Sequence, residues 1–336
     1  MINSCPQNAD PQDDLRSEEH TSELQDDLRS KSVVPPSAVH KAVMSDGAVI
    51  WLRRYGNPAG PRLVMSHGNG LAIEAYVLFW RQFLNSYDVV LFDMRNHGQN
   101  PLHEAAGHRW NRFVIDMEEI LDAIDEQFGG KPVVGVFHSL SAVTAVKHAD
   151  HYRGRWEGLI LFDPPIYPRH GHPLQPVEDA HMHDMVRRAS RRPSRYDNPA
   201  LLAQQFKRRP EFQGWVPGAA EQLAEATLRR NTQTGSWELC CPREFEAYIY
   251  QTNNDLSVWT ALCRPLKETP ITIIGADPEM ENQLPSASIC RAVAEEACLP
   301  YCSIPRTTHF LQFEQPELCY KATIEALAEE TRLRCG

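Results

Sequence analysis

The sequence predicts an α/β fold: a doubly wound, mostly parallel sheet that carries an inserted helical cap. Three observations support this prediction. Short apolar segments alternate with amphipathic helical segments, a β-hairpin pattern precedes them, and the region 166–263 interrupts the alternation. Because strands that alternate with helices usually run parallel, this pattern indicates one sheet with helices on both faces.

The elements follow in order from residue 39. Residues 39–56 are typical of a hairpin around an Asp46-Gly47 turn. The apolar strands that follow are expected at 62–66, 88–93, 131–137, 158–163, 270–275 and 301–304. Helical spacing is found at 71–87, 110–128, 286–297, after Ser139 and after Pro316.

The chain divides into four parts. We expect the sheet domain in two parts, 39–165 and 264–336. The part between them, 166–263, is too long for a loop in a compact domain and is interpreted as a mostly helical cap. Residues 1–38 are too polar to bury a face and contain "DDLRS" twice. The stretch "RSEEHTSELQ" resembles the translation of a common sequencing-library adapter, so we interpret this part as a sequence artefact, with a natural acidic tail as the alternative.

Composition excludes several classes of protein. The hydrophobic share of 42% and the charged share of 23% are typical of a globular chain and argue against disorder. No apolar run approaches the roughly 20 residues of a membrane-spanning helix. A net charge of −10 argues against nucleic acid as a partner. Nine cysteines without zinc-like or disulfide-framework spacing fit reduced thiols, so a cytoplasmic protein is expected.

The segment "VVGVFHSLSAVTAV" presents Ser139 where an apolar strand ends and a helix begins. A serine at such a sharp turn is how many hydrolases expose a nucleophile, in the pattern G-x-S-x-G. Here Phe137 and Ser141 occupy the two positions where small residues are expected, and only Ser141 is small. Two alternatives stay open: Ser139 is an N-cap of the helix, or Ser141 is the nucleophile.

Two further residues lie where an acid and a histidine are needed. Asp277 follows the strand 270–275, and His309 lies in the loop before the final helix. Their order along the chain (nucleophile, acid, histidine) fits a serine hydrolase in which histidine activates the serine. Asp277 is the preferred acid, and Asp163, at the end of an earlier strand, is the alternative. Together these features predict that Ser139 is the nucleophile.

The motifs "HGNG", "FDMRNHGQN", "FHSLS", "GADPE" and "HFLQFEQPE" resemble those of the α/β-hydrolase superfamily, in its capped branch. The resemblance covers about residues 39–334. The family loop D-x-R-G-H-G-x-S appears at 93–100 with two departures. The resemblance implies an acyl-enzyme mechanism in which the backbone N–H groups of Asn69 and Leu140 form the oxyanion hole. It implies no metal and no organic cofactor.

The expected function is hydrolysis of a small or medium carboxylic ester, which would be the small-molecule partner. The same triad would also serve a carbon–carbon bond hydrolase, a lactonase or an amidase. A ligand-binding receptor on the same fold is the alternative outside the enzymes. Candidate substrate-binding residues are His138, Phe212 and Trp215.

Other histidines and basic residues are expected to have plain structural roles. His67 and His97 are interpreted as packing and hydrogen-bonding groups of their loops. The H-x-H pairs at 170–172 and 181–183 lack further ligands at metal-binding spacing, so no metal site is predicted. The basic runs at 187–195 and 207–209, also in the cap, are interpreted as solvated helix faces.

Overall fold

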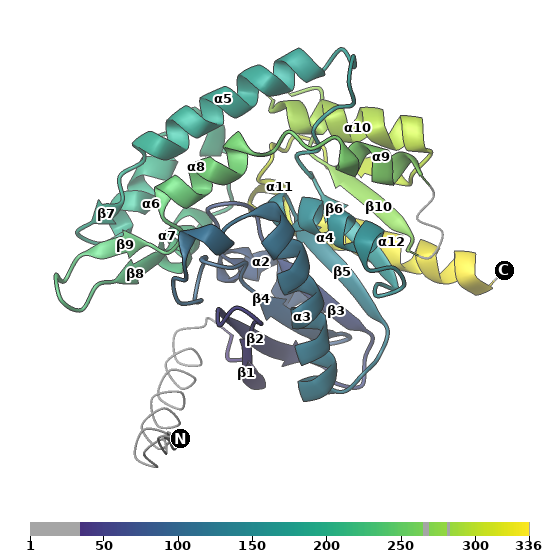
Figure 1. Ribbon diagram of the computed structural model, residues 1–336, viewed down its shortest axis with the longest axis horizontal. Helices are drawn as coiled ribbons and strands as arrows, with labels where there is room; N and C mark the ends of the chain where they lie inside the picture. Colours follow the sequence, from purple (N-terminus) through teal and green to yellow (C-terminus); the bar gives the residue numbers. More distant parts are fainter. Residues whose placement is uncertain (1–33, 265–268, 281–282, 336) are drawn as a thin grey trace, which may run out of the picture.

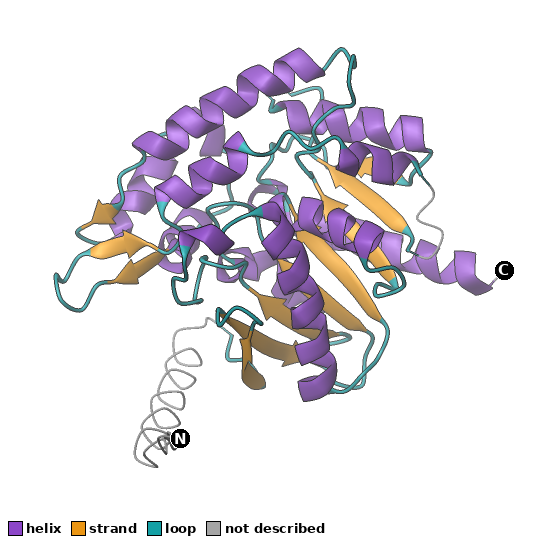
Figure 2. Cartoon of the chain, viewed as in Figure 1, coloured by secondary structure: helices purple, strands orange, loops and turns teal. Residues whose placement is uncertain are grey.

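The computed structural model describes residues 34–264, 269–280 and 283–335, and a sheet runs through its centre (Figures 1 and 2). Within these residues its strands are β1 (Ala38–Val43), β2 (Val49–Gly56), β3 (Arg62–Ser66), β4 (Asp88–Phe92), β5 (Val133–His138), β6 (Gly158–Phe162), β10 (Ile271–Gly275) and β11 (Tyr301–Ser303). Their order across the sheet is β1-β2-β4-β3-β5-β6-β10-β11. β2 is antiparallel to β1 and β4, and the other neighbours are parallel. The predicted α/β class is confirmed.

The first two strands form the predicted hairpin. Val43 pairs with Val49, and the turn between them places Gly47 at a φ of 85°. This left-handed conformation is one that glycine adopts without steric cost. The chain described before β1 also contacts the core: Val34 packs against it, and Ser37 donates its N–H to the Arg54 carbonyl. Of the tail predicted for residues 1–38, residues 34–38 are described and lie against the sheet domain. Residues 1–33 lie outside the described residues.

Helices cover both faces of the sheet. They are α2 (Val77–Trp80), α3 (Trp110–Phe128), α4 (Leu140–His151), α9 (Ser257–Cys263), α10 (Pro285–Ala297), α11 (Leu311–Glu314) and α12 (Pro316–Cys335). α3, α4, α9 and α10 share one hydrophobic cluster with one set of strand side chains, such as Val64. α2, α11 and α12 share the second cluster with the alternate set, such as Leu63 and Met65. Because successive side chains of a strand point to opposite faces, fully apolar strands fill both layers.

The single helix predicted over 71–87 is wrong in its length. The structure has α2 flanked by two 3₁₀ turns, Ile73–Tyr76 and Arg81–Phe83. The Ile73 N–H donates to the Asp93 carboxylate, and the Ile73 carbonyl accepts from the Trp80 indole. These side-chain bonds compete with a regular helix at this point.

The cap lies between β6 and β10 and covers one end of the sheet (Figure 1). Its helices are α5 (Gln175–Arg191), α6 (Pro199–Lys207), α7 (Ala219–Thr227) and α8 (Arg243–Gln251). It also contains a three-stranded sheet, β7 (Arg195–Tyr196), β9 (Trp237–Leu239) and β8 (Leu228–Arg230), in that order. The expectation of a mostly helical insertion holds, but the small sheet was not predicted because strands of two or three residues carry no readable alternation.

The far boundary of the cap lies earlier than residue 263. α9, which falls inside the predicted cap range, packs on α4 and α10, and its Trp259 and Leu262 belong to the core. α8 instead bridges the cap to the sheet. Its Glu246 carbonyl accepts from Asn69, and Asn253, just after it, donates to the Pro165 carbonyl. α8 is thus held at the ends of β3 and β6. No helix of the described residues is long and apolar enough to cross a membrane.

Candidate active site

Ser139 sits at the turn between β5 and α4 in a strained backbone conformation. Its φ is 54° and its ψ is −115°, a combination that residues other than glycine rarely adopt. The Ser139 N–H is anchored by the Phe162 carbonyl at 3.0 Å. Within the described residues the Ser139 side chain makes no capping bond to α4, and an N-cap normally has extended backbone geometry. This local geometry is that of a nucleophile elbow and not of an ordinary N-cap.

Phe137 fits the elbow because the small residue lies two positions earlier. The Phe137 ring is buried and packs edge-on against Phe92 and Trp156. A Cβ atom on Gly135 would lie 2.4 Å from the Phe137 ring and 2.8 Å from the Leu159 side chain. Gly135 therefore provides the space that a small residue at position 137 would otherwise provide.

This packing gives a stability prediction. Gly135→Ala is expected to destabilise the fold by about 1–3 kcal/mol, because overpacking a tight core forces side chains out of their preferred rotamers. Truncating the ring in the double variant Gly135→Ala/Phe137→Leu should recover part of that loss. Thermal unfolding of Gly135→Ala, Phe137→Leu and the double variant checks this prediction. If the loss in the double variant equals the sum of the losses in the two single variants, the proposed contact is contradicted.

The Ser141 hydroxyl is occupied within the turn. It donates to the His138 carbonyl at 3.0 Å and accepts from the His138 N–H at 3.2 Å. Ser141 is fully buried, whereas Ser139 contacts the predicted histidine. The geometry therefore favours Ser139 over Ser141.

His309 joins Ser139 to a buried carboxylate. Its Nε2 lies 3.0 Å from the Ser139 Oγ, and its Nδ1 lies 2.6 Å from the Asp163 Oδ2. Asp163 follows β6, has a φ of 40°, and accepts further hydrogen bonds from the Ser286 hydroxyl and the Ala276 N–H. Burial raises the pKa of Asp163, but the bonds from His309, Ser286 and Ala276 outweigh it and leave that pKa below its usual value. Asp163 is thus held ionised beside the imidazole.

Asp277 does not contact His309, so its assignment as the acid partner is corrected. Its carboxylate accepts from the Glu279 N–H at 3.0 Å and from the Arg306 N–H at 2.7 Å, and it fastens two loops together. The strand order explains the difference. β6 lies directly beside β5, whereas β10 is one strand further away, a spacing of about 4.8 Å. The loop after β6, which carries Asp163, is therefore the nearer one to the strand that ends at Ser139.

Two buried backbone N–H groups lie free beside Ser139, as the oxyanion-hole expectation requires. Among the described residues neither the Asn69 N–H nor the Leu140 N–H has a hydrogen-bond acceptor, although both residues are buried. The neighbouring N–H groups of Gly68 and Gly70 are already bonded. A Cβ atom on Gly68 would lie 3.1 Å from the Ser139 Cβ, so this loop passes directly against the serine. Buried donors rarely remain unpaired unless they have a ligand to bind.

His138 connects the oxyanion loop to the histidine loop. Its Nε2 lies 2.9 Å from the His309 carbonyl, which can only accept, so Nε2 carries the proton. Its Nδ1 then accepts from the Tyr76 hydroxyl at 2.7 Å, and that oxygen accepts from the Gly68 N–H. Burial, followed by the nearby His309, holds the pKa of His138 well below its usual value. Both ring nitrogens of His138 thus have protein partners, and its predicted substrate contact stays a prediction. Tyr76 has no motif that would have singled it out.

The loop 93–100 supports the oxyanion loop from behind. The His97 Nε2 accepts from the Gly70 N–H at 3.1 Å. Asn96, where the family pattern has glycine, adopts a φ of 61°, a left-handed conformation that asparagine tolerates better than most residues. Burial raises the pKa of Asp93, but the paired Arg53 guanidinium outweighs it and lowers that pKa to about 2.

His67 likewise has a structural role. Its Nδ1 lies 2.8 Å from the Gly68 carbonyl, and its Nε2 accepts from the Met94 N–H. The first bond lies within the oxyanion loop, and the second joins that loop to the loop after β4. The contacts of His67 and His97 agree with the structural roles expected for them.

Phe212 and Trp215 lie in an aromatic cluster next to His309. Their rings lie 5.3 and 5.2 Å from that of Phe310, and the Phe310 ring lies 5.7 Å from that of His309. Both also line a pocket of about 310 Å³ in the cap, together with Phe206 and other residues. The two predicted substrate-binding residues are therefore near the histidine loop, on a mostly aromatic wall.

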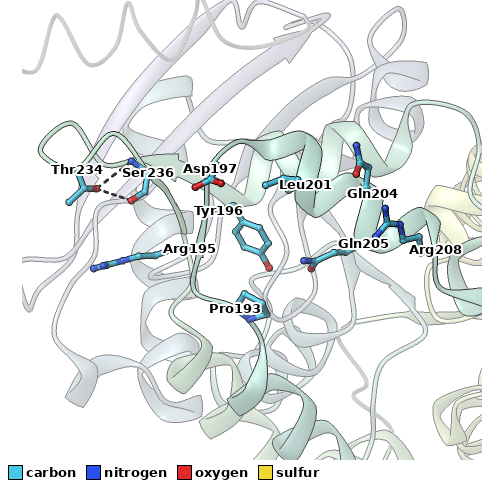
Figure 3. A pocket seen from close by; sticks show the side chains of 10 residues that line it. All are labelled: Pro193, Arg195, Tyr196, Asp197, Leu201, Gln204, Gln205, Arg208, Thr234 and Ser236. Atoms are coloured by element: carbon cyan, nitrogen blue, oxygen red, sulfur yellow. Dashed lines mark hydrogen bonds between the residues drawn. The ribbon is translucent and has the colours of Figure 1, made fainter.

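A larger pocket of about 540 Å³ opens elsewhere in the cap (Figure 3). It is lined by residues from the β7 region, from α6 and from the turn between β8 and β9: Pro193, Arg195, Tyr196, Asp197, Leu201, Gln204, Gln205, Arg208, Thr234 and Ser236. None of the residues around Ser139 lines it, so it is separate from the site described above.

The basic runs of the cap are largely paired with acidic side chains. Arg187 and Arg188 contact Asp184, and Arg192 contacts Glu246. The H-x-H pairs do not converge. The His172 ring packs on Trp259, the His183 Nδ1 bonds to the Asp179 carbonyl of its own helix, and no group of three or more potential metal ligands occurs among the described residues.

Comparison with known proteins agrees with this fold. Residues 63–322 match the model of the Alpha/beta hydrolase family. Human monoglyceride lipase is 26% identical over 141 residues, which are 40% of this chain and 46% of the lipase, so the match spans less than half of that relative. The crystal structure of E-2-(acetamidomethylene)succinate hydrolase superposes with a TM-score of 0.71 at 15% identity, covering 86% of this chain and 98% of that one.

A thermophilic esterase from Thermogutta terrifontis gives a TM-score of 0.62 at 19% identity, with coverage of 88% and 99%. At such identities these structures are evidence for the fold alone. The family model, however, covers most of the chain, including Ser139, Asp163 and His309. The chain belongs to the Alpha/beta hydrolase family.

Proposed function

We propose that the protein is a serine hydrolase that cleaves a small or medium carboxylic ester through an acyl-enzyme. The observation that carries this proposal is the line of three groups: Ser139 Oγ, the His309 ring and the Asp163 carboxylate, joined at 3.0 and 2.6 Å. A serine hydroxyl is a poor nucleophile at neutral pH, so a base within hydrogen-bond reach is the feature that gives it reactivity.

In the acylation step, Ser139 Oγ attacks the ester carbonyl carbon while His309 Nε2 takes its proton. Asp163 holds the proton on Nδ1, which keeps Nε2 free to accept, and stabilises the imidazolium that forms. The C–O bond to the alcohol then breaks, and the imidazolium returns the proton to the departing oxygen. The products are the alcohol and an acyl ester on Ser139.

The backbone N–H groups of Asn69 and Leu140 bind the oxygen on which negative charge develops. Each donor of this kind contributes about 2.7–4 kcal/mol to transition-state stabilisation. Water, deprotonated by His309, attacks the acyl ester through a second tetrahedral intermediate, and the acid leaves with Ser139 restored. These steps use only the protein groups and water.

An ester is the substrate class that fits best. A lipase and an esterase are among the proteins to which this chain is similar, although each at low identity. The aromatic wall of Phe206, Phe212, Trp215 and Phe310 offers an apolar surface beside the histidine loop, suited to an acyl chain.

Turnover of p-nitrophenyl esters tests the proposal. We expect the full chain to hydrolyse a panel of rising acyl length, with one preferred length, and Ser139→Ala to lower kcat by about 10⁶-fold, to near background. Ser141→Ala is the matched control and should retain most of the activity. Loss of activity in Ser141→Ala with retention in Ser139→Ala would reverse the assignment.

A further inference from the structure

Tyr76 and His138 join the oxyanion loop to the histidine loop through one chain of hydrogen bonds. The Gly68 N–H donates to the Tyr76 hydroxyl at 3.3 Å, and that hydroxyl donates to the His138 Nδ1 at 2.7 Å. The His138 Nε2 then donates to the His309 carbonyl at 2.9 Å. Every donor points in the same direction along this chain, and hydrogen bonds arranged in this way strengthen one another.

The two ends of the chain lie at groups that the reaction needs. Gly68 precedes Asn69, whose N–H is a proposed oxyanion donor, and a Cβ atom on Gly68 would lie 3.1 Å from both the His138 Nδ1 and the Ser139 Cβ. At the other end, the bond from His138 holds the peptide of His309. In the described part of the chain no other hydrogen bond reaches the His309 main chain. The position of the general base therefore depends on His138.

Close packing leaves the two linking side chains few other positions. Tyr76 is 2% exposed and His138 is 1% exposed. The Tyr76 ring lies 4.7 Å from that of Phe313 and 5.6 Å from that of His138, and the His138 ring lies 4.7 Å from that of His309. Rings packed in a dense interior transmit a displacement instead of absorbing it. A shift of one loop would therefore be felt by the other.

We propose that Tyr76 and His138 are positioning residues that hold the oxyanion loop and the histidine loop in register around Ser139. The attack on the ester needs both loops at once, because His309 must take the serine proton while the Asn69 N–H receives the developing charge. A displacement of about 1 Å at such groups costs about 100-fold in rate. This inference rests on the proposed acyl-enzyme mechanism and adds two residues to its machinery.

Ester kinetics and inhibition by an alkyl boronic acid test this inference together. The boron atom bonds to the Ser139 Oγ, the serine proton passes to His309, and the tetrahedral anion resembles the acylation intermediate. Tyr76→Phe lacks only the hydroxyl. On the preferred p-nitrophenyl ester it should lower kcat about tenfold, with KM within about twofold, because a buried donor loses its partner. The boronic acid should bind Tyr76→Phe more weakly by the same factor as the loss of kcat.

Two substitutions of His138 separate positioning from packing. His138→Leu removes both of the ring's bonds and should lower kcat and boronate affinity by about 100-fold. His138→Gln keeps an N–H that can reach the His309 carbonyl, so it should restore part of this loss. Because the residues act in one chain, adding Tyr76→Phe to His138→Leu should cause little further loss. The two His138 variants decide the inference alone if Tyr76→Phe does not fold.

Tyr55→Phe is the matched control. Tyr55 is also buried, and its hydroxyl bonds to the Glu74 carboxylate at 3.2 Å. This variant should lose thermal stability but keep kcat and boronate affinity. The inference is overturned if Tyr76→Phe and His138→Leu behave like this control, or if their kcat falls while boronate affinity stays the same. A folded wild-type protein that hydrolyses no ester and binds no boronic acid would instead overturn the proposed function.

Discussion

Asp163→Asn is expected to lower kcat by about 10⁴-fold while leaving the fold intact. An asparagine at this position would accept or donate at the His309 Nδ1 with nearly the same shape, but it would no longer fix the tautomer or stabilise the imidazolium. Asp163 also accepts from Ser286 and Ala276, so the amide would keep some of these contacts. Esterase kinetics on the purified variant measure the effect.

Asp277→Asn is the matched control. Asp277 bonds to the N–H groups of Glu279 and Arg306 and does not contact His309. We expect its kcat to remain within a few-fold of the wild-type value. A large loss of kcat in Asp277→Asn, together with an active Asp163→Asn, would show that the acid comes from the end of β10 after all.

Glu178→Met is expected to stabilise the protein, and to do so more as the pH rises. Both carboxylate oxygens of Glu178 are buried and have no hydrogen-bond partner in the described part of the chain. Burial, followed by the nearby Asp179 and Asp163 carboxylates, raises the pKa of Glu178 to about 8. The Cys290 thiol and the Tyr167 hydroxyl are also near enough to feel the charge of this carboxyl, and they supply no positive charge.

The sign follows from proton binding in the two states. In the unfolded chain Glu178 loses its proton near pH 4.5, whereas in the folded protein it keeps the proton until about pH 8. Between these values the folded state binds more protons, so a rise in pH favours unfolding. At 1.36 kcal/mol per pH unit, the cost grows on the order of 3 kcal/mol between pH 5 and 7.5.

Chemical denaturation at pH 5 and 7.5 measures this difference. Glu178→Met should gain little at pH 5 and on the order of 3 kcal/mol more at pH 7.5. Glu178→Gln removes the ionisation but leaves a buried polar group, so it should lose the same pH dependence with a smaller gain in stability. A gain that is equal at both pH values would contradict the ionisation argument.

Much of the fold could be predicted because strands and helices have different hydrophobic periods. β3 and α3 begin and end where the sequence pattern placed them, and β6 begins at the predicted residue and ends one residue earlier. Each is apolar or amphipathic over its whole length and ends at a turn signal. The break in the segment 71–87 could not be predicted, because it depends on two side-chain bonds to the Ile73 backbone. The Asp93 carboxylate comes from a distant part of the sequence, and the Trp80 indole reaches the Ile73 carbonyl only in the folded chain.

The site was only partly predictable for a similar reason. Ser139 and His309 have local signals, a strand-to-helix turn and a loop before the final helix. Asp163 and Asp277 both follow strands, and only the order of those strands in the sheet decides which lies beside His309. The space for the Phe137 ring depends on the missing side chain of Gly135. The sequence alone does not show that the ring packs over this glycine. Tyr76 comes to the site from a segment without a catalytic motif.

Labelling with a fluorophosphonate probe, followed by peptide mass spectrometry, tests the central claim most directly. The proposed geometry predicts a single covalent adduct on Ser139, formed by the wild-type protein and absent in Ser139→Ala. Such an adduct requires an activated serine and a site that the probe can enter. A folded wild-type protein that carries no adduct, or carries it on another serine, would contradict the assignment of Ser139 as the nucleophile.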